Sequence, residues 1–145
     1  MKYFLFQSLL IAAFFGFVSC KSSKTTSENM KTKQTELTEK HWKLAELNGI
    51  MVSETSREPF IVFEKDENRF HGNTSCNNFF GTFELNKKNK IKFSQGGMTK
   101  MACIGNQVET PFLEALENAV SFKYSDRQLT LSDGKKTVIA KFICD

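Results

Sequence analysis

The stretch from Arg69 to Phe83 constrains the fold of this chain more than any other. Its fifteen residues hold one cysteine, three asparagines, two glycines and four phenylalanines. Glycines such as Gly72 and Gly81 adopt positive φ or admit a close backbone, and asparagines hydrogen-bond their own main chain in turns. With the phenylalanines as the buried side, the stretch predicts two strands that meet at a tight, polar, cross-linkable turn.

The start of the chain indicates export. Lys2 precedes an apolar run from Tyr3 to Val18, and Ser19 and Cys20 follow it. The run is too short and too aromatic for a membrane span, so it predicts a signal peptide over residues 1–19. The Ser19-Cys20 junction resembles the lipobox of bacterial lipoproteins, which implies a diacylglyceryl group on Cys20. The alternative is an ordinary secretory signal with an incidental cysteine.

A polar segment follows Cys20. From Lys21 to Lys40 only Met30 and Leu37 are large apolar residues, so we expect residues 20–40 to be a lipidated cysteine with a flexible tether that adds nothing to a core. Such a tether reaches roughly 25 Å. We therefore expect a protein anchored in the cell envelope through its N-terminal lipid. Lys21, in place of an aspartate after the cysteine, favours the outer membrane and leaves the side of that membrane open.

Residues 41–145 hold the folded domain, and most of it predicts antiparallel strands. Alternation of apolar and polar residues, or short apolar runs, mark each strand, and polar or glycine-containing turns separate them. Asn48-Gly49 is a strong hairpin signal. The expected strands are 41–47, a short return at 50–52, 60–64, 69–72, 78–85, 90–93, 120–124, 128–131 and 137–143.

The pattern changes to a helical period beyond Gly96-Gly97. Apolar residues at 112, 113, 116, 119 and 120 mark one helix face. Pro111 behind Thr110 suits a helix start, while Asn106 with Glu109 resembles a capping box one turn earlier, so two starts stay open. The fold class predicted is α+β, mostly antiparallel β, with a strongly curved sheet or partial barrel covered by one helix.

These motifs together resemble the META domain of HslJ-type bacterial lipoproteins. The resemblance covers residues 41–145 and rests on Trp42-x-Leu44-x-x-Leu47-x-Gly49, Phe70-x-Gly72, Cys76-Asn77-x-Phe79-x-Gly81-x-Phe83, Thr99-Lys100-Met101-Ala102-Cys103, and Glu109-x-x-Phe112 with Leu116. Ser75 stands where the family commonly has glycine, and Phe83 where it commonly has tyrosine. The resemblance implies a small envelope domain linked to the heat-shock response and to novobiocin resistance, with no catalytic residues to carry over and no cofactor.

Other chemistry finds little support in the residues. His71, Cys76 and Cys103 are candidate zinc ligands, but no C-x-x-C or H-x-x-x-H spacing accompanies them, and exported cysteines tend to pair. A nucleophilic Cys76 beside His71 lacks an orienting third group. The net charge of +4, or +3 without Lys2, is small and scattered, which argues against nucleic acid. The acidic residues Glu109, Glu114 and Glu117 predict a solvated helix face.

Three cysteines remain after Cys20, so one is left over if two pair. Cys76 and Cys103 lie in the two densest motifs, and we predict that they form a disulfide. Cys144 is then the spare, near a chain end where fraying costs little. The alternative is that all three stay reduced and that Cys76 and Cys103 serve as small buried apolar residues.

Three function classes follow from this reading. The first is a lipid-anchored, non-catalytic binding or stress-response module for an unknown envelope protein or a hydrophobic ligand. The second is a periplasmic inhibitor of a protease or lysozyme, which a rigid protruding loop with a disulfide at its base would favour. The third is an enzyme, which clustered carboxylates in a cleft would favour. We expect the first, with no metal.

Overall fold

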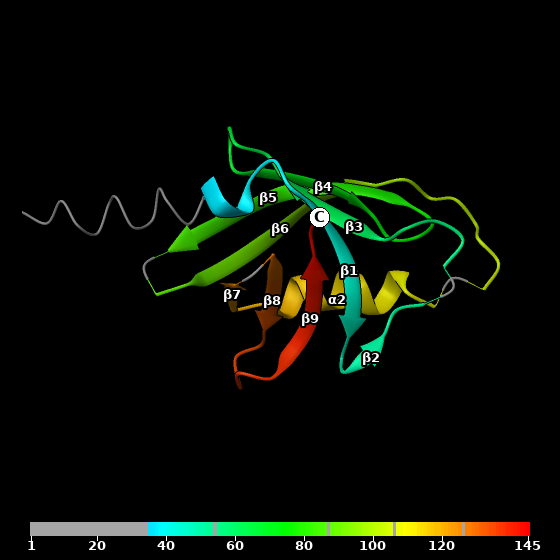
Figure 1. The fold of residues 1–145 in the computed structure, drawn as a ribbon. Helices are drawn as coiled ribbons and strands as arrows, with labels where there is room; N and C mark the ends of the chain where they lie inside the picture. The colour runs from blue at the N-terminus through cyan, green and yellow to red at the C-terminus, as the bar shows by residue number, and fades with distance from the viewer. Residues whose placement is uncertain (1–34, 54, 87, 106, 126) are drawn as a thin grey trace, which may run out of the picture.

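A computed structural model describes residues 35–145 except positions 54, 87, 106 and 126, and Figure 1 shows its fold. The predicted turns separate the strands, and the segment with a helical period forms a helix. The elements in chain order are β1 (His41–Leu47), β2 (Ile50–Met51), β3 (Phe60–Phe63), β4 (Arg69–Asn73), β5 (Asn78–Asn86), β6 (Lys90–Met98), α2 (Glu109–Asn118), β7 (Ser121–Ser125), β8 (Gln128–Ser132) and β9 (Val138–Ile143).

The strands form one curved antiparallel sheet that closes on itself. Their order is β2-β1-β3-β4-β5-β6-β7-β8-β9, and β1 pairs in addition with β9. Closure removes most open strand edges. One seam is weak, because among the described residues β6 pairs with β7 only at Lys90 and Ser121. The predicted fold class, mostly antiparallel β with a curved sheet and a helix, is confirmed.

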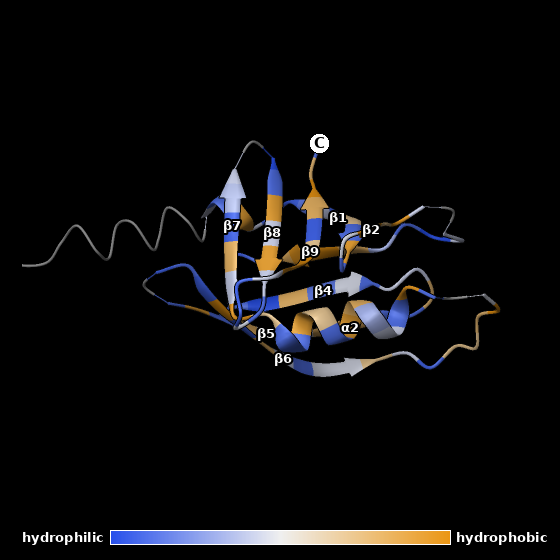
Figure 2. Ribbon diagram, turned by 90° about the horizontal axis from the view of Figure 1, so that it is seen from below, coloured by the Kyte–Doolittle hydropathy of each residue, from blue (hydrophilic) through white to orange (hydrophobic). Residues whose placement is uncertain are grey.

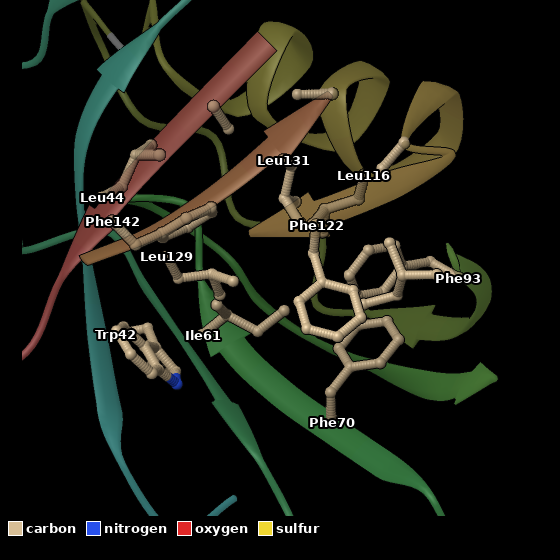
Figure 3. Close-up of a cluster of buried hydrophobic side chains, with 14 of the residues drawn as sticks. Trp42, Leu44, Ile61, Phe70, Phe93, Leu116, Phe122, Leu129, Leu131 and Phe142 are labelled. Atoms are coloured by element: carbon tan, nitrogen blue, oxygen red, sulfur yellow. The ribbon is translucent and has the colours of Figure 1, made fainter. Parts of the chain in front are cut away.

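Alternation along the strands builds the interior. In β5 every second residue from Phe79 to Phe83 is buried while the residues between them are exposed. The inward side chains are largely aromatic and meet edge to face, as Phe63 does with Phe83 at 5.0 Å and Phe70 with Phe93 at 5.3 Å between ring centroids. Figure 3 shows part of this core, with side chains from strands on both sides of the ring pointing toward one another.

Helix α2 covers the interior of the sheet. It contacts β6, β1, β8 and β9. Phe112, Ala115 and Leu116 are its buried residues. The Phe112 ring lies 5.4 Å from that of Phe79 and 5.7 Å from that of Phe142, so the helix joins strands that are far apart in the sheet. In Figure 2 the helix shows alternating hydrophobic and hydrophilic bands, as expected of a half-buried helix.

The predicted helix start at Thr110 is wrong. Val108 is the N-cap residue and has no side-chain cap hydrogen bond, so Thr110 and Pro111 lie inside the first turn. The physical reason is Glu109, whose carboxylate bonds to another segment of the chain and favours the positive helix end. Asn106, the other predicted cap, lies outside the described residues. Val120 is exposed and follows the helix.

Gly72 and Gly81 serve close backbone approach and not positive φ. A Cβ atom on Gly72 would meet the Phe60 carbonyl oxygen, and one on Gly81 the Ser94 carbonyl oxygen, both well inside 3.0 Å. The rings of Phe79 and Phe70 also cover these positions. Only a residue without a side chain fits there.

Strand β6 is longer than the predicted 90–93. Gly96 and Gly97 continue it to Met98, beside a register shift in the pairing between Phe80 and Gly81 of β5. The Phe80 ring lies over both glycines on the outer face of the sheet. An aromatic ring over glycines replaces the side-chain packing that these positions lack.

The fold includes residues that precede the predicted boundary at His41. Residues 35–37 are helical, and Leu37 is 0% exposed within the core. The Trp42 indole Nε1 donates a hydrogen bond of 2.9 Å to the Leu37 carbonyl, and the Glu39 amide donates one of 2.8 Å to the Phe63 carbonyl. The prediction that residues 20–40 add nothing to the core is therefore wrong at Leu37. A single apolar residue in a polar stretch has no periodicity by which to recognise it.

The predicted signal peptide at residues 1–19 and the lipidation site Cys20 lie outside the described residues. Among the helices that are described, none has the length and apolar character needed to cross a bilayer.

Candidate functional site

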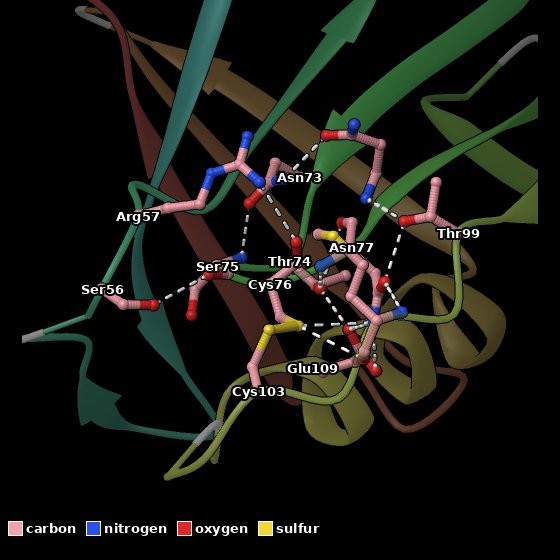
Figure 4. The surroundings of a disulfide bond; sticks show 12 residues. Ser56, Arg57, Asn73, Thr74, Ser75, Cys76, Asn77, Thr99, Cys103 and Glu109 are labelled. Carbon is pink, nitrogen blue, oxygen red and sulfur yellow. Dashed lines mark hydrogen bonds between the residues drawn. A yellow bond between two sulfur atoms is a disulfide. The ribbon is translucent and has the colours of Figure 1, made fainter.

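A disulfide between Cys76 and Cys103 ties two loops together at one end of the barrel. The Cα atoms of the pair are 6.0 Å apart, within the normal range for a disulfide. Cys76 lies in the turn between β4 and β5, and Cys103 in the loop between β6 and α2. Figure 4 shows this bond with the polar side chains around it. The structure thus joins the two cysteines that the sequence analysis selected.

Asn77 is the centre of the polar contacts at this end. Its Oδ1 accepts hydrogen bonds from the Met101 amide at 2.7 Å and from the Thr99 hydroxyl at 2.8 Å. Its Nδ2 donates to the Met101 carbonyl at 3.2 Å and to Glu109 Oε2 at 2.9 Å. The side chain is buried. One amide therefore fixes the loop after β6 and the start of α2 against the β4–β5 turn.

Glu109 completes the network from the helix side. Its Oε2 also accepts a hydrogen bond of 2.5 Å from the Thr74 hydroxyl, so two donors from the turn face one carboxylate. Thr74 is fully buried. The prediction that Glu109 belongs to a solvated acidic helix face is wrong, because this carboxylate is a structural acceptor and not a surface charge.

The turn itself is buried although every residue in it is polar or a cysteine. The Asn73 Oδ1 accepts a hydrogen bond of 2.9 Å from the Ser75 amide, which closes an Asx turn. Ser75 has φ of 78°, the left-handed region in which glycine is at ease. This explains in physical terms why a glycine is common at that position in the family that the sequence resembles.

Two hollows adjoin at the same end of the barrel. The larger, about 640 Å³, lies between the loop after β2 and the loop before α2. The smaller, about 360 Å³, lies between the β1–β2 hairpin and the start of α2. They share Ser53, Gln107 and Val108, and we call them together the loop-end groove. The other lining residues are Thr55, Ser56, Ser75, Ile104 and Gly105 in the larger hollow and Leu47, Asn48, Ile50, Met51, Val52 and Pro111 in the smaller one.

Exposed aliphatic side chains line this groove. Ile104, one residue after Cys103, is fully exposed, Ile50 is 74% exposed and Met51 is 68% exposed. Sequence reasoning missed all three as site residues. Their apolar character is compatible with strand or core positions, and only the structure shows that they face solvent.

Comparison with known proteins identifies the family. The family model for the META domain matches residues 35–142. The chain belongs to the META domain family. A search of curated proteins finds no match. The matched range begins at residue 35, in agreement with the buried Leu37.

Solved structures share the fold of this META domain. One is the NMR structure of a protein from Burkholderia xenovorans, with 22% identity, a TM-score of 0.62, and coverage of 79% of this chain and 88% of that one. A second NMR structure has 23% identity, a TM-score of 0.58, and coverage of 76% and 93%. At these identities the likeness shows the fold alone.

The motif residues of the META domain occupy two kinds of position, in the core of the sheet and around the disulfide. Trp42, Gly72, Phe79 and Gly81 are buried in the sheet and its core. The second kind surrounds the disulfide, where Thr99 and Met101 bond to the buried Asn77. Met101 contributes its backbone, while its side chain is 48% exposed.

The residues considered for metal or nucleophilic chemistry are not brought together. His71 lies on the outer face of the sheet and bonds to Glu64 at 3.1 Å, whereas Cys76 and Cys103 are joined to each other. The described residues contain no group of three or more His, Cys, Asp or Glu side chains placed for a metal ion. Cys144 is the unpaired cysteine, as predicted, and its side chain is buried, with 9% exposed.

Shifted ionisation occurs on the outer face of the sheet. The hydrogen bond from Lys43 lowers the pKa of Glu58, with a further bond from His41, and Glu58 raises the pKa of Lys43 in return. The Lys43 to Glu58 distance is 2.8 Å and both side chains are well exposed. Such a surface ion pair needs no catalytic explanation.

Proposed function

We propose that this META-domain protein is a lipid-anchored, non-catalytic binding module of the cell envelope. The observation that carries the proposal is the loop-end groove, with aliphatic side chains exposed on loops that a disulfide and a buried amide hold in place. Exposed apolar side chains that gather around a hollow are typical of binding surfaces. The well-connected polar groups beside the groove hold loops together, which favours binding over catalysis.

Anchoring is supported by the sequence around Cys20. Mass spectrometry of the mature N-terminus tests it, and the expected result is a lipid-modified peptide that begins at Cys20. An unmodified mature chain that begins at another residue would contradict anchoring. If the chain carries lipid, fractionation of the envelope would show whether it resides in the outer membrane, which Lys21 favours, or in the inner one. A role in heat-shock or antibiotic tolerance rests on resemblance to HslJ alone.

Binding is tested with matched surface variants. The full chain carrying Ile50→Asp and Ile104→Asp is compared with wild type and with Val138→Asp, a control at another exposed apolar position. Each is used to capture cross-linked partners from detergent-solubilised envelope. We expect a partner that wild type and the control retain and the double variant loses. Equal capture by all three chains would reject the groove as the binding surface.

A second function, inhibition of a protease or lysozyme, is favoured by one specific feature. Ile104 protrudes directly after the disulfide cysteine Cys103, and Asn77 bonds to both backbone groups of Met101, two residues before that cysteine. Inhibitors gain affinity from loops that are already rigid. Assays against envelope proteases and lysozyme, with Ile104→Asp as the inactive control, test this function. Full enzyme activity at saturating protein would reject it.

A further inference from the structure

The described residues that line the loop-end groove are polar and uncharged or apolar. Hydroxyl and amide side chains of Ser53, Thr55 and Gln107 lie in its larger part, and aliphatic side chains dominate the smaller part. None of the described lining residues is Asp, Glu, Lys, Arg or His. The aliphatic side chains of the smaller part favour an occupant that brings apolar side chains of its own.

The backbone at the groove has an open strand edge. β2 stands at the end of the strand order, paired with β1 alone, and it lines the smaller hollow through Ile50 and Met51. Ile50 is registered with Leu47 across the Asn48-Gly49 turn, and the Val52 amide donates to the Ala45 carbonyl at 2.9 Å. Since backbone groups alternate in direction along a strand, those of Met51 point away from β1.

An open edge and an apolar rim together suit an extended chain. A peptide strand that pairs with Met51 would place its side chains alternately against the barrel and away from it. Ile50 and Met51 are consecutive in β2 and point to opposite faces, so aliphatic side chains of one peptide row would meet Ile50 and those of the other row would meet Met51. Beyond the end of β2 the peptide would meet Ile104 and the hydroxyl and amide groups of the larger hollow.

The groove also faces away from the point at which the N-terminal segment joins the domain. Figures 1 and 2 both place the helical residues 35–37 at one end of the molecule and the loop before α2 and strand β2 toward the other. A peptide bound at the edge of β2 would therefore lie away from the helical residues 35–37.

We propose that the loop-end groove binds an extended peptide segment with aliphatic side chains, added as a strand to the open edge of β2 at Met51. This rests on the proposed binding function and names its ligand class. Strand addition supplies affinity through the main chain, and the aliphatic rim selects the side chains.

The test uses the full mature chain in detergent and a capped, fluorescent octapeptide that alternates valine with serine. Fluorescence anisotropy measures binding, with detergent alone as the blank. A second peptide has aspartate in place of valine, and an uncharged chitin tetrasaccharide is the competitor. We expect binding of the valine peptide, about tenfold weaker binding of the aspartate peptide, and no competition by the saccharide.

Protein variants then locate the site. Ile104→Asp replaces an aliphatic side chain of the rim with a charge. Met51→Pro removes one N–H that points away from β1 and makes no hydrogen bond to that strand. Both are expected to weaken the valine peptide about tenfold, whereas Val138→Asp leaves its affinity unchanged. Circular dichroism melts confirm that all variants fold.

The outcomes separate this inference from the proposed function. If no peptide binds, or if Met51→Pro binds as wild type does, strand addition is wrong even when envelope capture still depends on Ile50 and Ile104. Competition by the saccharide would assign the groove to glycans and also overturn the inference. If envelope capture is itself independent of the groove, the proposed function fails first.

Discussion

At Asn77 one amide side chain holds three segments of chain together. Its oxygen and nitrogen bond to Thr99 and Met101 from the loop after β6, and its nitrogen bonds to Glu109 at the start of α2. Such a contact is useful because the amide both donates and accepts, which neither a carboxylate nor a hydroxyl does with the same geometry.

Asn77→Ala is expected to destabilise the domain by about 3 kcal/mol, because it removes the acceptor of the Met101 amide and one of the donors to Glu109. Urea denaturation measures the change. Asn118→Ala is the control, since that exposed amide bonds only to the carbonyl of Glu114 four residues earlier. Similar losses from both variants would show that the network contributes no more than a surface contact.

The sequence singled out Asn77, Thr99, Met101 and both cysteines, because their motifs are dense in turn-forming and polar residues. It did not show what these residues contact. The sequence pattern predicts a solvated position for Glu109. A helical pattern does not reveal that this acid contacts a turn more than thirty residues earlier in the chain. The sequence did not predict Ile50, Met51 and Ile104 as groove residues for a related reason. Exposure of an apolar side chain depends on the fold around it.

At the scale of the elements, two glycines decide how β3, β4, β5 and β6 approach one another. Gly72 of β4 lies against the Phe60 carbonyl of β3, and Gly81 of β5 lies against the Ser94 carbonyl of β6. Phenylalanine rings from the next strands fill the space that side chains would otherwise take. The alternation of the sequence predicted these strands, while the helix start and the length of β6 depended on contacts with distant residues.

Gly72→Ala and Gly81→Ala are each expected to destabilise the domain by about 3 kcal/mol, because the added methyl group collides with a backbone carbonyl oxygen as well as with a packed phenylalanine ring. Gly134→Ala is the matched control, since its Cβ meets nothing within 4 Å. Thermal melts of the three variants measure the difference. A melting temperature close to wild type for Gly72→Ala would mean that the strands separate without cost.

At the scale of the whole molecule, the barrel depends on contacts at its two ends. The disulfide ties the loops at one end. On the side where the N-terminal segment joins the domain, Leu37 packs in the core, and its carbonyl accepts a hydrogen bond from Trp42. The fold class was predictable because antiparallel alternation and one helical period leave few architectures. The start of the domain was not predictable from the sequence, because Leu37 is recognisable only by the residues that bury it.

Leu37→Ala is expected to cost about 3 kcal/mol, as for other fully buried leucines. Ile50→Ala, at a position 74% exposed, should change stability by less than about 0.5 kcal/mol. Guanidinium denaturation of the full chain measures both. If the two substitutions have equal effects, residue 37 belongs to the tether after all.

Cys103→Ser is expected to destabilise the domain by about 3 kcal/mol, because the disulfide closes a loop of 27 residues in the unfolded chain. Reducing agent should lower the melting temperature of wild type and leave that of the variant unchanged. Cys144→Ala is the control, with a cost of about 1 kcal/mol from its buried thiol. A wild-type melting temperature insensitive to reductant would contradict a stabilising role for the bond.

The pairing of β1 with β9 determines when this chain can finish folding. The first and last strands of the sheet are neighbours, with Leu44 opposite Phe142, although almost a hundred residues separate them in sequence. Non-local pairing of this kind forms slowly, because a long loop must close first. A nascent chain that has not yet released residues 138–143 therefore lacks a strand of its barrel.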